Sequence, residues 1–206
     1  MPYPRFERLA QNKRDLLLDV AAQEFANHGF EQASINRILE RSHMSKGAAY
    51  YYFEDKADLF CAVIQYASER LDLASVQVEP TMLTTGNFWT TIAEIHRLPL
   101  VRAMERPWLF KILNVAAQRA LADLDREPLA SLTQQMRTLL IDLIKQGQSI
   151  GAIRTDLPDD LILSWILALD GASDDWLTNH WGEIDIARLV QISDQTIAAL
   201  KNALIP

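Results

Sequence analysis

The chain has few of the residues that form covalent or metal-bound frameworks. It contains one cysteine, Cys61, which excludes a disulfide within the chain. A phosphate-binding loop, zinc-ligand spacing and a nucleophile elbow are all missing from the sequence. The four histidines are scattered, and only Asp174, Asp175 and His180 approach metal-like clustering, which an acidic, solvated helix end explains better than a metal. We therefore expect no enzyme activity, no cofactor and no metal site.

Glycine, proline and long apolar runs are also scarce. The 206 residues include seven glycines and eight prolines, and the prolines stand between apolar helical patterns. This arrangement predicts an all-α fold. The longest apolar run, residues 161–169, is too short to span a bilayer, and the N-terminal residues lack the apolar core of a signal peptide. With the single cysteine, these features predict a cytoplasmic protein without a membrane partner.

The net charge of −7 is unusual for a nucleic-acid binder, but the acidic excess is unevenly placed. Residues 1–56 hold eight Lys/Arg and eight Asp/Glu, so the whole excess lies in residues 57–206. A neutral module with a basic arm can still bind DNA through a few well-placed phosphate contacts.

Residues 34–53 hold two short helical patterns. Ile35, Ile38 and Leu39 recur at the spacing of one helix face. Ser34 and Ser45 are each placed to cap a helix start, and residues 42–44 form the turn between the two helices. The stretch is therefore predicted to be a helix-turn-helix.

The second of these helices has an unusual outward face. Helical spacing turns Ala49 and Phe53 inward, and it turns Gly47, Ala48 and Tyr51 outward. Small residues beside tyrosines suit the close approach of a large partner more than they suit a solvated surface, which usually carries Glu and Lys.

Residues 45–60, SKGAAYYYFEDKADLF, resemble the recognition helix and the start of the following helix in the tetracycline-repressor (TetR) family of bacterial transcription regulators. Residues 14–30 are similar to the first helix of that family. Two positions depart from the family pattern. His43 stands where the family usually has glycine in a turn that often needs positive φ, and Ala49 stands where Leu or Phe is common.

The resemblance implies a DNA-binding surface and a palindromic double-stranded operator. The expected contacts are Ser34, Asn36, Arg37, Lys46, Gly47, Ala48, Tyr50, Tyr51, Tyr52 and Lys56. Residues 1–12, with Arg5 and Arg8, are expected to form a flexible arm, which either reaches the DNA or is a frayed terminus. The alternative for the tyrosines is a packing patch for another protein.

Beyond the N-terminal residues the resemblance is limited to helical character. We expect a helix-turn-helix domain at 1–56 and a helical ligand-binding and dimerisation domain at 57–206, about nine helices in all. Proline placement and apolar periodicity predict helices at 13–28, 56–76, 88–98, 100–105, 107–122, 128–148, 158–179 and 185–203, the sixth ended by Gly147 and Gly151.

Large apolar side chains in the second domain either form plain core or line a pocket, and only the family resemblance implies an inducer pocket here. The candidates for a small apolar or aromatic effector are Trp89, Met104, Trp108, Phe110, Leu113, Met136, Leu140 and Trp165.

The helix at 158–179 is apolar almost all round, so it needs cover on two sides, and a second copy of the chain is a plausible cover. The expected interface residues are Trp165, Leu169, Ala172, Leu189, Ile197 and Leu200. A homodimer would present two recognition helices about 34–36 Å apart, or farther on a widened site.

Three hypotheses follow. The first is a repressor that a small ligand releases from its operator. The second is a DNA-binding dimer without an inducer, and the third is a helical enzyme or protein-interaction adaptor that does not bind DNA.

Overall fold

The computed structural model describes residues 3–72, 82–120 and 129–206. The regular structure of these residues is helical, as the sequence predicts, and contains no strand. The chain divides into two compact units. One comprises Met1–Leu73 and Trp108–Thr133, and the other comprises Ala74–Pro107 and Gln134–Pro206. The functional boundary that we place at residue 56 remains a proposal. None of the helices described is long and apolar enough to cross a membrane.

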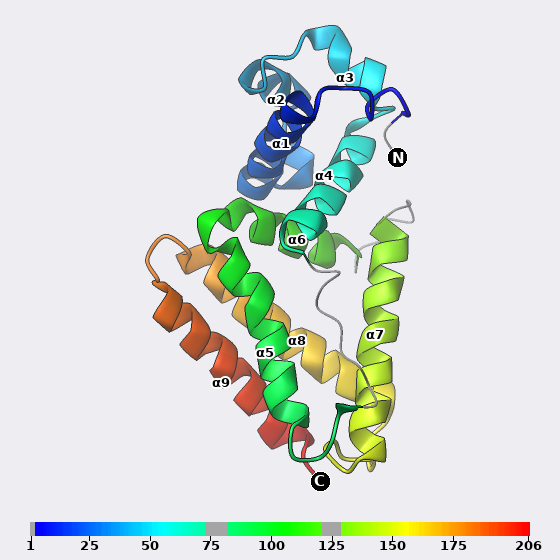
Figure 1. Ribbon diagram of the computed structural model, residues 1–206, viewed down its shortest axis with the longest axis vertical. Helices are drawn as coiled ribbons and strands as arrows, with labels where there is room; N and C mark the ends of the chain where they lie inside the picture. The colour runs from blue at the N-terminus through cyan, green and yellow to red at the C-terminus, as the bar shows by residue number, and fades with distance from the viewer. Residues whose placement is uncertain (1–2, 73–81, 121–128) are drawn as a thin grey trace. The chain divides into compact units, whose positions relative to one another are not determined.

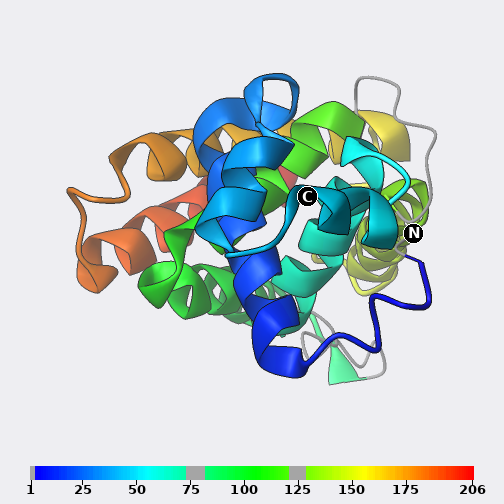
Figure 2. The same ribbon diagram turned by 90° about the horizontal axis from the view of Figure 1, so that it is seen from above.

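The first unit holds α1 (Gln11–Gln32), α2 (Ile35–Arg41), α3 (Lys46–Tyr52), α4 (Lys56–Arg70) and α6 (Pro107–Ala120). α1 packs along α4 and beside α2 (Figures 1 and 2). The predicted apolar stripes of α1 and α4 are both buried: Leu17, Val20, Ala21, Phe25, Leu59, Phe60, Val63, Ile64, Ala67 and Leu71. Burial of these two faces against each other is the main source of stability for this unit.

The chain leaves the regular path of α1 at Gly29. This residue has φ 67° and ψ 172°, a conformation that glycine adopts without a steric penalty. The break lets Phe30 fold back, so that its ring lies 6.0 Å from that of Phe25 and 5.1 Å from that of Phe60. The predicted helix stop is therefore confirmed, although three further residues in helical hydrogen bonding extend α1 to Gln32.

Other helix ends differ from the prediction or cannot be compared with it. α4 ends at Arg70, before the predicted end at 76, and Asp72 then turns the chain with φ 49°. Residues 73–76, residues 121–122 and Pro128, which the sequence assigned to helix ends, lie outside the described residues.

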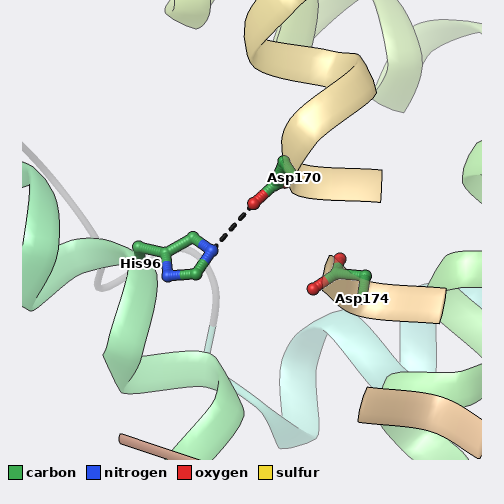
Figure 3. Close-up of side chains that lie close together, drawn as sticks. All are labelled: His96, Asp170 and Asp174. Atoms are coloured by element: carbon green, nitrogen blue, oxygen red, sulfur yellow. Dashed lines mark hydrogen bonds and ion pairs between the residues drawn. The ribbon is translucent and has the colours of Figure 1, made fainter. Parts of the chain in front are cut away.

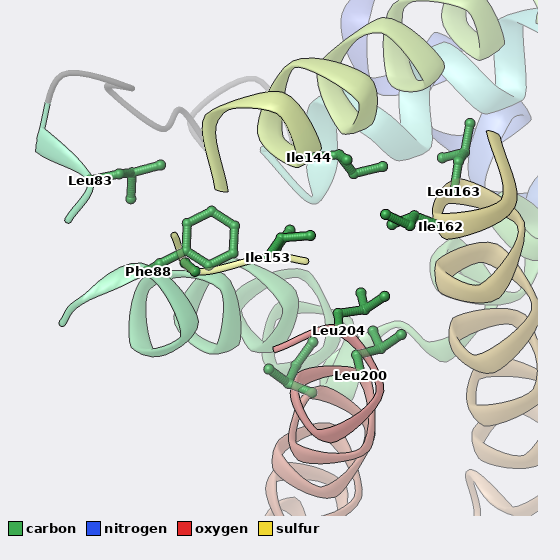
Figure 4. Close-up of a cluster of buried hydrophobic side chains, with 10 residues drawn as sticks. Leu83, Phe88, Ile144, Ile153, Ile162, Leu163, Leu200 and Leu204 are labelled. Atoms are coloured by element: carbon green, nitrogen blue, oxygen red, sulfur yellow. The ribbon is translucent and has the colours of Figure 1, made fainter. Parts of the chain in front are cut away.

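The second unit holds α5 (Phe88–Arg102), the short 3₁₀ helix η3 (Ala103–Glu105), most of α7 (Leu129–Ser149), α8 (Asp159–His180) and α9 (Ile186–Leu204). α9 packs against both α5 and α8. Their core is a cluster of fully or nearly fully buried side chains (Figure 4), namely Leu83, Phe88, Ile144, Ala152, Ile153, Ile162, Leu163, Ile197, Leu200 and Leu204.

The prediction that Pro99 halts a helix was wrong, because α5 runs through Pro99 to Arg102. Proline removes one helical hydrogen bond at a cost of about 3 kcal/mol in a helix interior. Here the residues just after it are buried, with Leu100 at 2% exposure and Ala103 at 0%. Burial of this last turn offsets the lost hydrogen bond, and the N–H of Ala103 closes the turn on the carbonyl of Pro99.

The assignment of Gly147 to a helix end was also wrong, because it lies inside α7 and only Gly151, at φ 71°, adopts the left-handed conformation. Gly147 is there for packing. A Cβ atom at this position would lie 2.7 Å from Ile153 Cδ1 and 2.9 Å from Phe88 Cζ. Glycine therefore allows the end of α7 to approach the core.

Replacing Gly147 by alanine is expected to lower the free energy of unfolding by about 1–3 kcal/mol, because both neighbours are buried and must shift. Gly171→Ala is the matched control, since an added Cβ there meets nothing within 4 Å. Chemical denaturation of the two variants measures the difference. Equal free energies of unfolding for the two variants would show that Ile153 and Phe88 move aside without an energetic cost.

Candidate nucleic-acid interface

The helix-turn-helix is held by local hydrogen bonds from α2 and its turn. Ser34 caps α2, its Oγ accepting the N–H of Arg37 at 3.4 Å. At the other end the Oγ of Ser42 donates to the carbonyl of Ile38 at 2.7 Å, and the N–H of Met44 reaches the carbonyl of Leu39 at 2.8 Å. Ser34 is thus the predicted cap, and the turn lies at the predicted residues.

His43 adopts the left-handed conformation that the family pattern predicts for this position, with φ 56°. A left-handed conformation costs a residue with a Cβ about 1–2 kcal/mol, and glycine does not incur this cost.

We expect His43→Gly to raise the free energy of unfolding by about 0.5–1 kcal/mol. The gain is smaller than the steric cost because glycine also makes the unfolded chain more flexible. Urea denaturation of His43→Gly and of the wild type tests this prediction. A urea midpoint for the variant that is unchanged or lower than that of the wild type would contradict it.

α3 presents an exposed face. Tyr50 is 74% exposed and Tyr51 is 53% exposed, whereas Tyr52 is half-buried and Phe53 is buried. Gly47 is exposed as well, and no atom lies within 4 Å of where its Cβ would be. The side chains of two other predicted contacts, Lys46 and Ala48, lie outside the described residues, although both belong to α3. The predicted outward face is therefore open at Gly47 and Tyr51, and Tyr50 beside it is exposed as well.

The N-terminal arm is packed against α3, which corrects the prediction that it is flexible. The N–H of Tyr3 donates to the carbonyl of Tyr52 at 2.9 Å. Phe6 is 2% exposed, and its ring lies 4.9 Å from that of Phe53 and 5.7 Å from that of Tyr52. The burial of one aromatic side chain thus anchors the arm. The position of Phe6 between Arg5 and Glu7 gave a weak signal of this role in the sequence.

The packed arm places positive charge beside the exposed tyrosines. The guanidinium of Arg5 stacks on the rings of Tyr3 and Tyr51, 4.4 Å from each centroid. Beside it lies a hollow of about 250 Å³. Its lining is mostly basic or aromatic and consists of Arg5, Arg8, Leu9, Ala10, Lys13, Tyr51 and Tyr52. A basic, aromatic surface continuous with α3 suits a phosphate backbone.

A buried carboxylate, Glu24 of α1, holds α2 in place. It is 2% exposed, and its Oε1 accepts the N–H of Ser34 at 3.0 Å and the Nε of Arg37 at 2.8 Å. Nε2 of His28 and Nη1 of Arg41 lie within 4.0 Å of its other oxygen. The sequence reasoning missed Glu24, although it lies on the same helical stripe as the buried apolar residues of α1.

This network changes the roles expected for Ser34 and Arg37. The N–H of Ser34 and the guanidinium of Arg37 both donate to Glu24. These hydrogen bonds hold the start of α2, so both groups are less available to a phosphate than we expected. Arg37 remains about half exposed, and Asn36 is exposed.

Burial alone would raise the pKa of Glu24. The hydrogen bonds from Arg37 and from the N–H of Ser34, together with the charges of Arg37 and His28, outweigh burial, so the pKa of Glu24 lies below its ordinary value of 4.5. The carboxylate is therefore ionised at neutral pH and pairs fully with Arg37.

Lys56 also has an internal role. Its Nζ donates to the carbonyl of Glu31 at 3.0 Å and lies 4.8 Å from the centroid of the Phe30 ring. These contacts connect the start of α4 to the end of α1. Asp55 caps α4 by accepting the N–H of Asp58 at 2.9 Å.

The predicted pocket residues are distributed over both units. Trp108, Phe110 and Leu113 belong to the first, where Trp108 Nε1 donates to Asp19 of α1 at 2.9 Å. The second unit contains the others, Trp89, Met104, Met136, Leu140 and Trp165. Of these, Trp89 and Leu140 pack against the core, while Met136 and Trp165 are 46% and 40% exposed. The residues therefore do not gather within one unit, and the pocket stays a prediction.

The predicted dimer residues fall into two groups. Leu189, Ile197 and Leu200 are at most 5% exposed and are buried in the protomer, so they offer little surface to a partner. This corrects their expected role, and the reason is that α9 uses its apolar face against α5 and α8. The other group lies on α8, where Trp165 and Ala172 are exposed and Leu169 is partly buried.

The comparison with protein families agrees with this geometry. The family model described as "Bacterial regulatory proteins, tetR family" matches residues 17–63, which span α1, α2, α3 and the first half of α4. This match supports a TetR family transcriptional regulator.

Relatives of the TetR family extend the likeness over most of the chain. The HTH-type transcriptional repressor Rv1474c of Mycobacterium tuberculosis is 27% identical over 173 residues, which cover 83% of this chain and 85% of that protein. A TetR family regulator from Chloroflexus aurantiacus superposes with a TM-score of 0.70 at 23% identity, covering 99% of this chain and 98% of its own.

FadR of Bacillus subtilis, solved in complex with stearoyl-CoA, superposes with a TM-score of 0.67 at 16% identity and covers 90% of this chain and 96% of its own. At these identities the two superpositions establish the fold alone. TetR family regulators bind DNA and dimerise, and some bind small-molecule effectors.

Proposed function

We propose that this chain is a homodimeric repressor that binds a palindromic operator through α3 and the packed N-terminal arm, and that a small apolar ligand releases it. One observation carries the DNA-binding part. Gly47, Tyr50 and Tyr51 form an open face on α3, and Arg5 extends that face with positive charge. Gly47 permits close approach, and the tyrosine hydroxyls and Arg5 can bind phosphates or base edges.

The dimer is supported by an apolar stripe along α8. Leu161, Trp165, Ala172 and Trp176 recur at helical spacing, and each is exposed. The three larger side chains are 39–40% exposed, which is unusual for leucine and tryptophan on a helix of an isolated chain. A second copy covering this stripe would bury it and would bring two recognition helices onto one duplex.

The ligand part of the proposal rests on the family and on the stearoyl-CoA complex of the structural neighbour FadR. Exposed apolar side chains on α7, Met136 at 46% and Leu139 at 42%, are compatible with contact to an apolar ligand. A ligand that lowers DNA affinity must itself bind more weakly to the DNA-bound protein, by a coupling of about 1–3 kcal/mol.

Selection of bound duplexes from a random pool, followed by fluorescence anisotropy, tests the DNA-binding function. The selected site is expected to be a palindrome. Tyr51→Ala should weaken binding to it by about 10-fold or more, as the loss of a groove contact does. Met82→Ala, which truncates an exposed side chain outside α3 and the N-terminal arm, is the control and should bind as the wild type does. The proposal would be contradicted if no sequence were selected from the pool and the wild type and Tyr51→Ala bound duplex DNA with equal affinity.

Stearoyl-CoA is the first probe for the effector, with free coenzyme A as the matched control. If an acyl chain is the ligand class, stearoyl-CoA should displace the protein from the selected duplex and coenzyme A should not. Displacement by neither compound, with unchanged melting temperatures, would exclude this class and favour a repressor without an acyl effector.

A further inference from the structure

α5 and α8 bring three potential metal ligands together in the second unit. Asp170 and Asp174 are four residues apart, so both point from one face of α8. They face His96 on α5 (Figure 3), and His96 Nε2 lies 2.8 Å from Asp170 Oδ1. One ligand atom from each of the three residues can be chosen so that all lie within 4.8 Å of one another.

A buried hydroxyl on α9 orients the His96 ring. Ser193 is fully buried, and its Oγ lies 2.7 Å from His96 Nδ1. This contact directs the other ring nitrogen, Nε2, toward the two carboxylates. Histidines that bind metals usually have such a partner on the second nitrogen, which fixes the ring and its tautomer. The ring itself has a side-chain exposure of 16%, so it is held by packing as well.

The carboxylate of Asp174 is near other negative charges. Among the described residues, no hydrogen bond or ion pair joins it to a positive group, and Arg97, the neighbour of His96, pairs with Asp194 at 3.1 Å instead. The nearest charged neighbours of Asp174 along α8 are the acids Asp170 and Asp175. A cation between Asp170 and Asp174 would compensate these charges.

We propose that His96, Asp170 and Asp174 bind one divalent first-row transition metal ion, with His96 Nε2 and one oxygen from each aspartate as ligands. The ligand atoms of such an ion, about 2.1 Å from the metal, stand about 3–4 Å apart. In the structure these atoms lie within 4.8 Å of one another, so the widest pair must close by about 1 Å to reach this geometry. A metal-bound Nε2 carries no proton, so the ring binds as the tautomer whose Nδ1–H donates a hydrogen bond to Ser193 Oγ, and any proton on Nε2 leaves to solvent.

The ligand types narrow the choice of metal. One imidazole and two carboxylates suit Zn²⁺, Co²⁺, Ni²⁺ or Mn²⁺, whereas Mg²⁺ and Ca²⁺ prefer oxygen ligands alone and Cu⁺ prefers sulfur. Three protein ligands also leave at least one coordination position open for water or for an oxygen of a bound molecule. The metal would cross-link α5 to α8 within the second unit.

This cluster differs from the one metal-like grouping in the sequence, which is better explained as an acidic, solvated helix end. The sequence placed His180 near Asp174 and Asp175, but in the structure the His180 ring stacks on Trp176 and its Nδ1 lies 2.8 Å from the carbonyl of Trp176. His96 lies 74 residues from Asp170. Only the fold, in which α5 and α8 both pack against α9, reveals the cluster.

Titration of chelator-treated protein with Zn²⁺ by calorimetry tests the proposal, with Co²⁺ absorption as a report on the ligand type. We expect one ion per chain and a Zn²⁺-dependent rise in melting temperature. Asp174→Asn should abolish both, and Ser193→Ala should weaken binding by about 10–100-fold. Asp175→Asn, which removes the neighbouring charge but none of the three ligands, should bind as the wild type does.

Metal-free Asp174→Asn is expected to fold, because asparagine has nearly the same shape and volume as aspartate, and its melting temperature without metal tests this directly. The proposal is overturned if Zn²⁺ leaves the wild type unchanged. It is also overturned if folded Asp174→Asn binds Zn²⁺ as tightly as the wild type, or if His180→Gln and not Asp174→Asn removes binding. The readouts need no operator, so this test is independent of the proposed repressor function.

Discussion

Substituting alanine for Gly47 is expected to weaken binding to the selected operator by about 10-fold, and leucine at the same position by about 100-fold, while the protein stays folded. A Cβ at Gly47 meets no atom within 4 Å, so the folded chain accommodates alanine, and because Gly47 is exposed the leucine side chain is expected to extend into solvent. Gly47 lies in α3, where replacing glycine by alanine raises the stability of a helix by about 0.5–1 kcal/mol. Any loss of DNA affinity must therefore come from the bound state.

This substitution separates contact with DNA from folding, which removal of a large aromatic side chain cannot do as clearly. Anisotropy with labelled duplex measures affinity, and thermal denaturation measures stability on the same samples. Gly182→Ala is the control, because it adds the same methyl group to an exposed glycine outside α3. Wild-type affinity in Gly47→Leu would show that the backbone of α3 does not approach DNA.

Replacing Glu24 by alanine should lower the free energy of unfolding of the DNA-binding unit by about 2–4 kcal/mol. The substitution leaves the N–H of Ser34 and the guanidinium of Arg37 without their shared acceptor. The loss of a buried, charge-assisted network has this magnitude, reduced here because Arg37 is about half exposed. Glu69→Ala, at an exposed position with one hydrogen bond to Gln65, should cost less than about 0.5 kcal/mol.

The same network predicts a pH dependence. The pKa of Glu24 is lower in the folded chain than its ordinary value of 4.5, so the unfolded chain binds its proton more readily. The stability that Glu24 supplies is therefore fully present above about pH 4.5 and is lost as the pH falls through the folded-state pKa. Urea midpoints between pH 3 and pH 7 should fall less steeply in Glu24→Ala than in the wild type, and parallel curves would contradict this assignment.

Sequence reasoning located the parts of the fold that depend on local patterns. The left-handed conformation of His43 was expected from the family resemblance, whereas the stripes of α1 and α4, the stop at Gly29 and the cap at Ser34 each follow from residue type and spacing within a few residues. These features depend on steric and hydrogen-bonding rules that act along the chain, so one sequence is sufficient to predict them.

The features that could not be predicted from the sequence depend on contacts between residues that are far apart along the chain. Arg5 reaches Tyr51, and Glu24 reaches Ser34 and Arg37, because α1, α2 and the arm pack together. The continuation of α5 past Pro99 follows from tertiary burial that outweighs local propensity. For the same reason, the buried positions of Leu189, Ile197 and Leu200 could not be separated from an interface by periodicity, which identifies an apolar face but not its partner.

Footprinting of the selected operator with the purified chain, at known protein-to-duplex stoichiometry, tests the central claim most directly. The account predicts protection of two half-sites related by a dyad and about one helical turn or more apart, with two chains bound per duplex and both half-sites lost together in Gly47→Leu. A single protected site occupied by one chain, or protection that is unchanged in Gly47→Leu, would contradict it.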